Sequence, residues 1–115
     1  MDIKSISKRL TKFAEARDWE QYHSPKNLAI SLGVEVGELL EIFQWLPENH
    51  DFTGDEAVRS RATEEIADIF IYAIMLSQKL DIDVEKAILR KISVNEKKYP
   101  VEKAKGSSKK YSEFG

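Results

Sequence analysis

The chain has 115 residues, a formal net charge of −2 and no Cys. This length predicts one domain with a modest core, and the absence of Cys excludes a disulfide framework. Mixed charges along the whole chain give no basic surface for polymeric nucleic acid. The sequence shows no basic-then-apolar leader and no apolar run of membrane length. We therefore expect a soluble cytoplasmic protein that binds neither polymeric nucleic acid nor a membrane.

Helical periodicity dominates the sequence, and strand alternation is absent. Apolar residues keep a helical period through a first helix that should end near Asp18. Ser24 is expected to be the N-cap of a second helix, with Pro25 as its first residue, because Pro at that position loses no hydrogen bond. This second helix should stop before Pro47.

The tetrad Thr53-Gly-Asp-Glu56 has the spacing of a capping box and predicts the start of a third helix, with Thr53 as its N-cap. Asp83 can cap a fourth helix, which Pro100 should end. The tail, residues 101–115, is rich in Lys, Ser and Gly, and its composition alone indicates disorder. We therefore expect one helical domain over residues 1–100, followed by this tail.

Two acidic pairs, Glu35 with Glu38 and Glu65 with Asp68, lie inside the two most apolar stretches of the chain. Residues three apart share a face of an α-helix, so each pair directs two carboxylates the same way. Carboxylates without a partner are unfavourable in a poorly hydrated interior, which indicates that a divalent cation joins the four. A solvated stripe on two amphipathic helices is the alternative, and it would be preferred for one pair alone. Two such pairs favour the metal site.

The ligand type narrows the choice of metal. All four candidates are hard oxygen donors, which suit Mg²⁺, with Mn²⁺ as a substitute. A di-iron bundle would instead need a Glu-x-x-His pair on each of two helices. Only Glu20 and His23 have that spacing, and they lie in a segment that we expect to be a connection.

Helix phase places two further residues near these acids. Glu41 flanks Glu38 on the side opposite Glu35, so the three acids form one arc. Glu41 could be a third ligand, a group that orients a ligand, or the base that activates water. Tyr72 shares a helix face with the second acidic pair, where it could pack on a base or sugar, or serve as a core aromatic with a polar tip.

The segments EVGELLEIFQW (35–45) and EIADIFIY (65–72) resemble the E-x-x-E…E-x-x-D signature of the MazG-like all-α nucleoside triphosphate pyrophosphohydrolases. Residues 13–28, 91–100 and 107–113 resemble the dCTP pyrophosphatase branch of this family, and only residues 46–61 are dissimilar. The resemblance implies an all-α four-helix bundle that forms a homodimer or homotetramer. It also implies Mg²⁺-dependent cleavage of a nucleoside triphosphate, dCTP or a modified dCTP, to the monophosphate and pyrophosphate. The third helix is apolar nearly all round, which independently predicts that a second subunit covers part of it.

The resemblance also assigns roles to residues of this chain. The implied metal ligands are Glu35, Glu38, Glu65 and Asp68. The water at the α-phosphorus would lose its proton to Glu38 or Glu41.

The implied nucleotide pocket contains Trp19, His23, Trp45 and Tyr72. Leu10 departs from the family pattern, in which a His stands at this position, and this leaves the base preference open. Lys91, Asn95 and Lys98 share one helical face, which either reaches the triphosphate oxygens or is simply solvated.

Two other classes of function stay open on the sequence. One is a non-catalytic helical module that binds Mg²⁺ or a nucleotide. The other is a protein-interaction domain whose apolar faces bind a different protein. Pyrophosphate release separates an enzyme from a binding module, and thermal stabilisation by Mg²⁺ with nucleotide separates a nucleotide site from an interaction surface.

Overall fold

The computed structural model describes residues 1–106, and every regular element in this part of the chain is helical. The elements are α1 (Ile3–Ala16), η1 (Glu20–Tyr22), α2 (Pro25–Phe43), α3 (Glu56–Lys79), α4 (Val84–Lys98) and α5 (Val101–Ala104). The predicted all-α class is confirmed. Among the stretches that resemble the family, residues 107–113 lie outside the described residues.

The chain divides into two compact units, Met1–Ile82 and Asp83–Gly115. The first unit contains α1, η1, α2 and α3, and the described part of the second contains α4 and α5. Packing of α4 on the first three helices, which a four-helix bundle requires, stays a prediction, as does the single domain over residues 1–100. The short helix α5 lies at the start of the tail for which composition alone indicated disorder.

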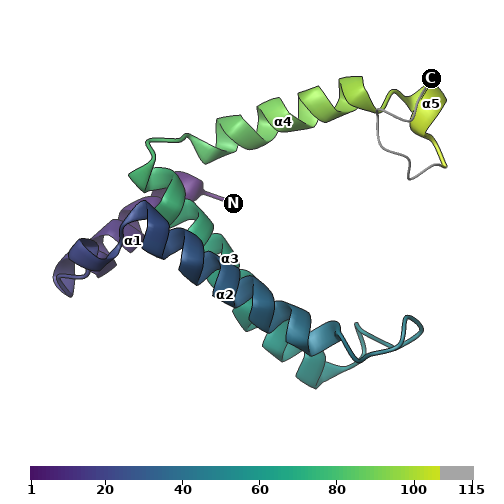
Figure 1. The fold of residues 1–115 in the computed structure, drawn as a ribbon, viewed down its shortest axis with the longest axis horizontal. Helices are drawn as coiled ribbons and strands as arrows, with labels where there is room; N and C mark the ends of the chain where they lie inside the picture. Colours follow the sequence, from purple (N-terminus) through teal and green to yellow (C-terminus); the bar gives the residue numbers. More distant parts are fainter. Residues whose placement is uncertain (107–115) are drawn as a thin grey trace. The chain divides into compact units, whose positions relative to one another are not determined.

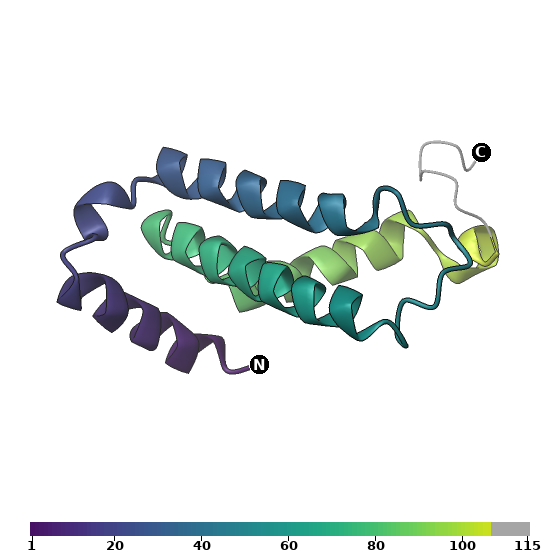
Figure 2. The ribbon, with the colours of Figure 1, turned by 90° about the horizontal axis from the view of Figure 1, so that it is seen from below.

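Within the first unit, α2 and α3 lie side by side and run in opposite directions (Figures 1 and 2), and α1 packs against α3. The buried apolar side chains come from all three helices: Ala14, Leu28, Ile42, Val58 and Ile74. A hydrogen bond also joins α1 to α3, because the side-chain amide of Gln78 donates to the Ser7 carbonyl at 2.9 Å. None of the helices in the described range is both long and apolar enough to cross a membrane.

The ends of α1 and α2 follow from local sequence. Asp18, directly beyond α1, adopts a left-handed backbone conformation with φ of 54°, which stops the helix two residues before the predicted end. The hydroxyl of Ser24 accepts a hydrogen bond from the Asn27 backbone N–H at 3.1 Å, and Pro25 is the first helical residue. The predicted start of α2 is therefore confirmed, and the helix ends at Phe43, before Pro47.

The N-cap of α3 is Asp55, and the prediction of Thr53 as the cap was wrong. The carboxylate of Asp55 accepts a hydrogen bond from the Val58 N–H at 3.1 Å, and the His50 ring lies 2.9 Å from its other oxygen. These two partners, in that order of importance, hold the pKa of Asp55 below its ordinary value. Thr53 instead belongs to the preceding turn, where its hydroxyl donates to Asp51.

The start of α4 is the predicted one, because Asp83 accepts a hydrogen bond from the Lys86 N–H at 3.1 Å. This helix ends at Lys98, two residues before Pro100. Lys97 and Lys98 occupy its last turn, where positive charge interacts favourably with the helix dipole.

Candidate functional site

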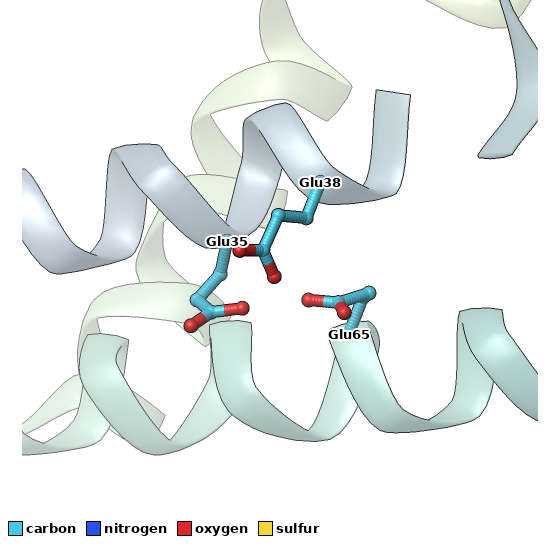
Figure 3. Close-up of side chains that lie close together, drawn as sticks. All are labelled: Glu35, Glu38 and Glu65. Atoms are coloured by element: carbon cyan, nitrogen blue, oxygen red, sulfur yellow. The ribbon is translucent and has the colours of Figure 1, made fainter. Parts of the chain in front are cut away.

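Three carboxylates meet between α2 and α3. Glu35 and Glu38 extend from one face of α2 toward α3, and Glu65 extends from α3 to meet them (Figure 3). One oxygen from each carboxylate lies within 4.8 Å of the others. The arrangement follows from the sequence, because the first two acids are one helical turn apart and antiparallel packing brings the middle of α3 opposite them.

The acidic cluster consists of Glu35, Glu38 and Glu65. The Oε2 atoms of Glu35 and Glu65 are buried and have no hydrogen-bond partner among the described residues. The pKa of Glu35 is raised from 4.5 to about 7, first by a hydrogen bond to Glu65, then by burial and by Glu38. The carboxyl group of Glu35 therefore keeps its proton to higher pH than an ordinary glutamate does.

The donor set of the acidic cluster fits a hard divalent cation. Carboxylate oxygens are the ligands that Mg²⁺ and Mn²⁺ prefer, and no nitrogen or sulfur donor belongs to the group. Two of these oxygens are buried without a hydrogen-bond donor, which is unfavourable in the metal-free chain. A bound cation would satisfy both of them. Glu38 is exposed, so one side of the cluster is open to solvent and to a substrate.

Asp68, the fourth predicted ligand, is not among the three clustered acids. It lies one turn further along α3, at the wall of a cavity of about 370 Å³. The cavity is formed by residues from α1, from the connection that contains η1, and from α3: Leu10, Phe13, Trp19, His23, Asp68, Ile71, Tyr72 and Met75. The spacing of Asp68 from Glu65 links this cavity to the acidic cluster along one face of α3.

Three of the four predicted nucleotide-pocket residues, Trp19, His23 and Tyr72, line this cavity together. Their rings come from segments far apart in sequence, and the packing of α1 against α3 unites them. Most of the remaining lining is apolar, which suits a flat base, and the polar groups of His23 and Asp68 supply orientation.

Three further residues line the same cavity and were not predicted from the sequence: Phe13, Ile71 and Met75. A signal for the last two was present, because positions 68, 71, 72 and 75 repeat at three- and four-residue spacing and share a helix face. Phe13 has the same relation to Leu10 on α1. Its role depends on how α1 docks, which no local pattern specifies.

Several predicted site residues are not brought together with these groups. Glu41 is exposed on α2 and is not part of the acidic cluster. Trp45 lies just beyond α2, is 86% exposed and does not line the cavity. Lys91, Asn95 and Lys98 belong to α4 in the second unit, so their contact with a triphosphate stays a prediction.

Comparison with known proteins places this geometry in a family. The sequence model of the MazG-like family matches residues 30–114. The chain is 40% identical to dCTP pyrophosphatase 1 of Bos taurus and 39% identical to that of Homo sapiens, in each case over 97% of its length and 68% or 67% of the relative's. A crystal structure of a pyrophosphatase from Archaeoglobus fulgidus has 40% identity and a TM-score of 0.80, covering 87% of this chain and 94% of that one. The chain belongs to the MazG-like family.

Proposed function

We propose that this chain, a nucleoside triphosphate diphosphatase of the MazG-like family, uses Mg²⁺ or Mn²⁺ to cleave dCTP or a modified dCTP to the monophosphate and pyrophosphate. The observation that carries the proposal is the acidic cluster beside a cavity lined by Trp19, His23 and Tyr72. A group of carboxylates that can hold a cation, close to an aromatic pocket, is what a metal–nucleotide complex requires. The relatives named as dCTP pyrophosphatases support the choice of base.

Glu35, Glu38 and Glu65 would hold the cation, with Asp68 extending the line of carboxylates toward the cavity. Once bound, a divalent cation neutralises phosphate charge and makes a water molecule more acidic. The exposed Glu38 would accept the proton from the attacking water, and Glu41 is the alternative base. The water oxygen bonds to the α-phosphorus, the bond from that phosphorus to the bridging oxygen breaks, and pyrophosphate leaves with that oxygen.

Trp19 and Tyr72 would hold the base by its faces and edges, and His23 would orient it. Aromatic stacking is tolerant of base identity, so specificity has to come from the polar atoms and from the shape of the wall. Leu10 occupies part of that wall, where the family pattern has a polar residue. For this reason, a panel of canonical and modified pyrimidine triphosphates is the informative substrate set.

Assembly as a homodimer or homotetramer is part of the proposal. Large apolar side chains on the packed helices are exposed in the described chain: Ile30, Val34 and Leu40 on α2, and Ile66 and Phe70 on α3. Apolar area of this extent on two adjacent helices favours a covering subunit. Light scattering after gel filtration measures the state directly, and a monomer at micromolar concentration would contradict this part.

The function is tested by incubating the protein with each nucleotide and measuring pyrophosphate and monophosphate together. We expect equal amounts of both with Mg²⁺, fastest with dCTP or a modified dCTP. Thermal stabilisation by Mg²⁺ with nucleotide, but with no pyrophosphate, would identify a binding module instead. Absence of both responses would favour a protein-interaction domain.

A further inference from the structure

Phe13 lines the cavity, and its ring contacts both an aromatic ring and a guanidinium, although it has no part in the proposed hydrolysis. Its ring centroid lies 5.6 Å from that of Trp19, with the two ring planes 75° apart, an edge-to-face arrangement. The guanidinium carbon of Arg17 lies 3.8 Å from the centre of the same ring. Phe13 and Trp19 are 45% and 44% exposed, so this pair forms the cavity wall and is not part of the buried core.

Trp19 needs an external support for its side chain. Its backbone is fixed, because its N–H donates to the Ala14 carbonyl at 2.9 Å directly after the left-handed Asp18. The indole N–H, by contrast, has no hydrogen-bond acceptor among the described residues. Among the described residues, the directional interaction of the indole is its edge-to-face contact with Phe13.

Arg17 holds Phe13 by two attachments. Its guanidinium lies over the ring, and one of its nitrogens donates to the Phe13 carbonyl at 3.1 Å in the last turn of α1. A cation over an aromatic face and a hydrogen bond to the same residue restrict both the ring and the helix end. Arg17, Phe13 and Trp19 thus form a chain of contacts that ends at the cavity.

We propose that Phe13, secured by Arg17, is a positioning residue that presets the Trp19 ring for stacking on the nucleotide base. The inference rests on the proposed function, because the base is the partner for which the indole is held. If the Trp19 ring is already ordered before the nucleotide binds, binding does not have to supply the free energy of ordering it. The predicted signature is an increase in KM at nearly constant kcat, since Phe13 touches none of the atoms that react.

The test uses Phe13→Leu, which keeps an apolar side chain, and Phe13→Tyr, which keeps the ring. Both are made in a Trp45→Phe background, so that Trp19 is the sole tryptophan and its near-ultraviolet circular dichroism and fluorescence anisotropy report its order. We expect Phe13→Leu to raise KM about 3- to 10-fold with kcat within about twofold, the range of one aromatic pair. The Trp19 dichroism and anisotropy should fall in Phe13→Leu. In Phe13→Tyr, the KM, the dichroism and the anisotropy should all stay close to those of the Trp45→Phe background.

Phe52→Leu is the matched control. Phe52 also makes an aromatic pair, with its ring centroid 5.8 Å from that of Phe43, and it does not line the cavity. We expect this variant to lower the melting temperature without changing KM or the Trp19 spectra. Arg17→Gln should reproduce the KM increase of Phe13→Leu in weaker form, about two- to threefold.

Unchanged Trp19 spectra in Phe13→Leu would overturn the inference, and so would an equal KM increase in Phe52→Leu, which would indicate general loosening. A large fall in kcat at constant KM would also overturn it. If the parent protein releases no pyrophosphate from any nucleotide, the proposed function fails on its own. The dichroism of the nucleotide-free variants still decides whether Phe13 orders Trp19.

Discussion

Replacing Glu35 by Gln should stabilise the metal-free protein above neutral pH while abolishing hydrolysis. The carboxylates of the acidic cluster have oxygens within 4.8 Å of one another, and Glu35 has two such neighbours. Two unit charges at that separation repel by about 0.9 kcal/mol in a water-like medium and by more in a partly buried one. An amide of the same shape removes this repulsion and can donate a hydrogen bond to Glu65.

The pH dependence gives this prediction its sign. The pKa of Glu35 is raised from 4.5 to about 7, so the folded chain binds this proton more tightly than the unfolded chain does. The stability that the proton contributes is fully present below pH 4.5 and is lost as pH rises through 7. Glu35→Gln should therefore match the parent near pH 4.5 and exceed it at pH 8, by roughly 5 °C in melting temperature.

The assay is thermal unfolding in excess chelator at pH 4.5, 6 and 8, beside the rate of pyrophosphate release in Mg²⁺. Glu41→Gln is the matched stability control, because Glu41 lies on the same helix, is exposed and is outside the acidic cluster. Its melting temperature should differ little from the parent at each pH. A Glu35→Gln protein that melts earlier than the parent at pH 8 would refute the reasoning, since that result requires a cation paired with Glu35 in the metal-free state.

Three further predictions concern the metal, the pocket and the helix cap. Titration calorimetry at pH 6 in buffers of different ionisation enthalpy should show proton release as Mg²⁺ or Mn²⁺ binds. The apparent metal affinity should rise as pH passes 7, and an affinity independent of pH would contradict the raised pKa of Glu35. Trp19→Ala should weaken nucleotide binding by roughly 1–3 kcal/mol. Trp45→Ala should also weaken it while preserving helical content and Mg²⁺ binding. An unchanged KM in either variant would show that the replaced residue is not part of the pocket. Asp55→Ala should lower the melting temperature at pH 7. Because the pKa of Asp55 is depressed, the difference from the parent should disappear in acid, below pH 3.8. A difference that stays constant with pH would show that the charge of Asp55 does not contribute to the cap.

Local signals in the sequence were sufficient for most helix boundaries. Ser24 and Asp83 cap their helices through hydrogen bonds to residues three positions on, and such contacts need no tertiary context. The cap of α3 was missed because Thr53 and Asp55 both suit an N-cap. In the structure Asp55 accepts the Val58 N–H and its other oxygen lies 2.9 Å from the His50 ring, whereas the Thr53 hydroxyl donates to Asp51 in the preceding turn.

The acidic cluster was predictable in part, and the cavity only through its individual residues. Helix periodicity correctly placed Glu35 and Glu38 on one face directed toward another helix. The axial position of α3 along α2, which periodicity does not specify, determines that Glu65 joins them and Asp68 does not. The cavity depends on the docking of α1, which sequence periodicity does not encode. Trp19 and Tyr72 could be proposed as pocket residues by resemblance, but their proximity to Phe13 could not.

The central claim is that a divalent cation held by the acidic cluster drives cleavage between the α- and β-phosphates. The most direct test is a single dCTP reaction followed for dCMP and pyrophosphate, first in excess chelator and then after addition of Mg²⁺ or Mn²⁺. We expect no product in chelator, equal amounts of dCMP and pyrophosphate once the cation is added, and no recovery in Glu65→Gln. Undiminished hydrolysis in chelator, or recovery with Zn²⁺ alone, would contradict it.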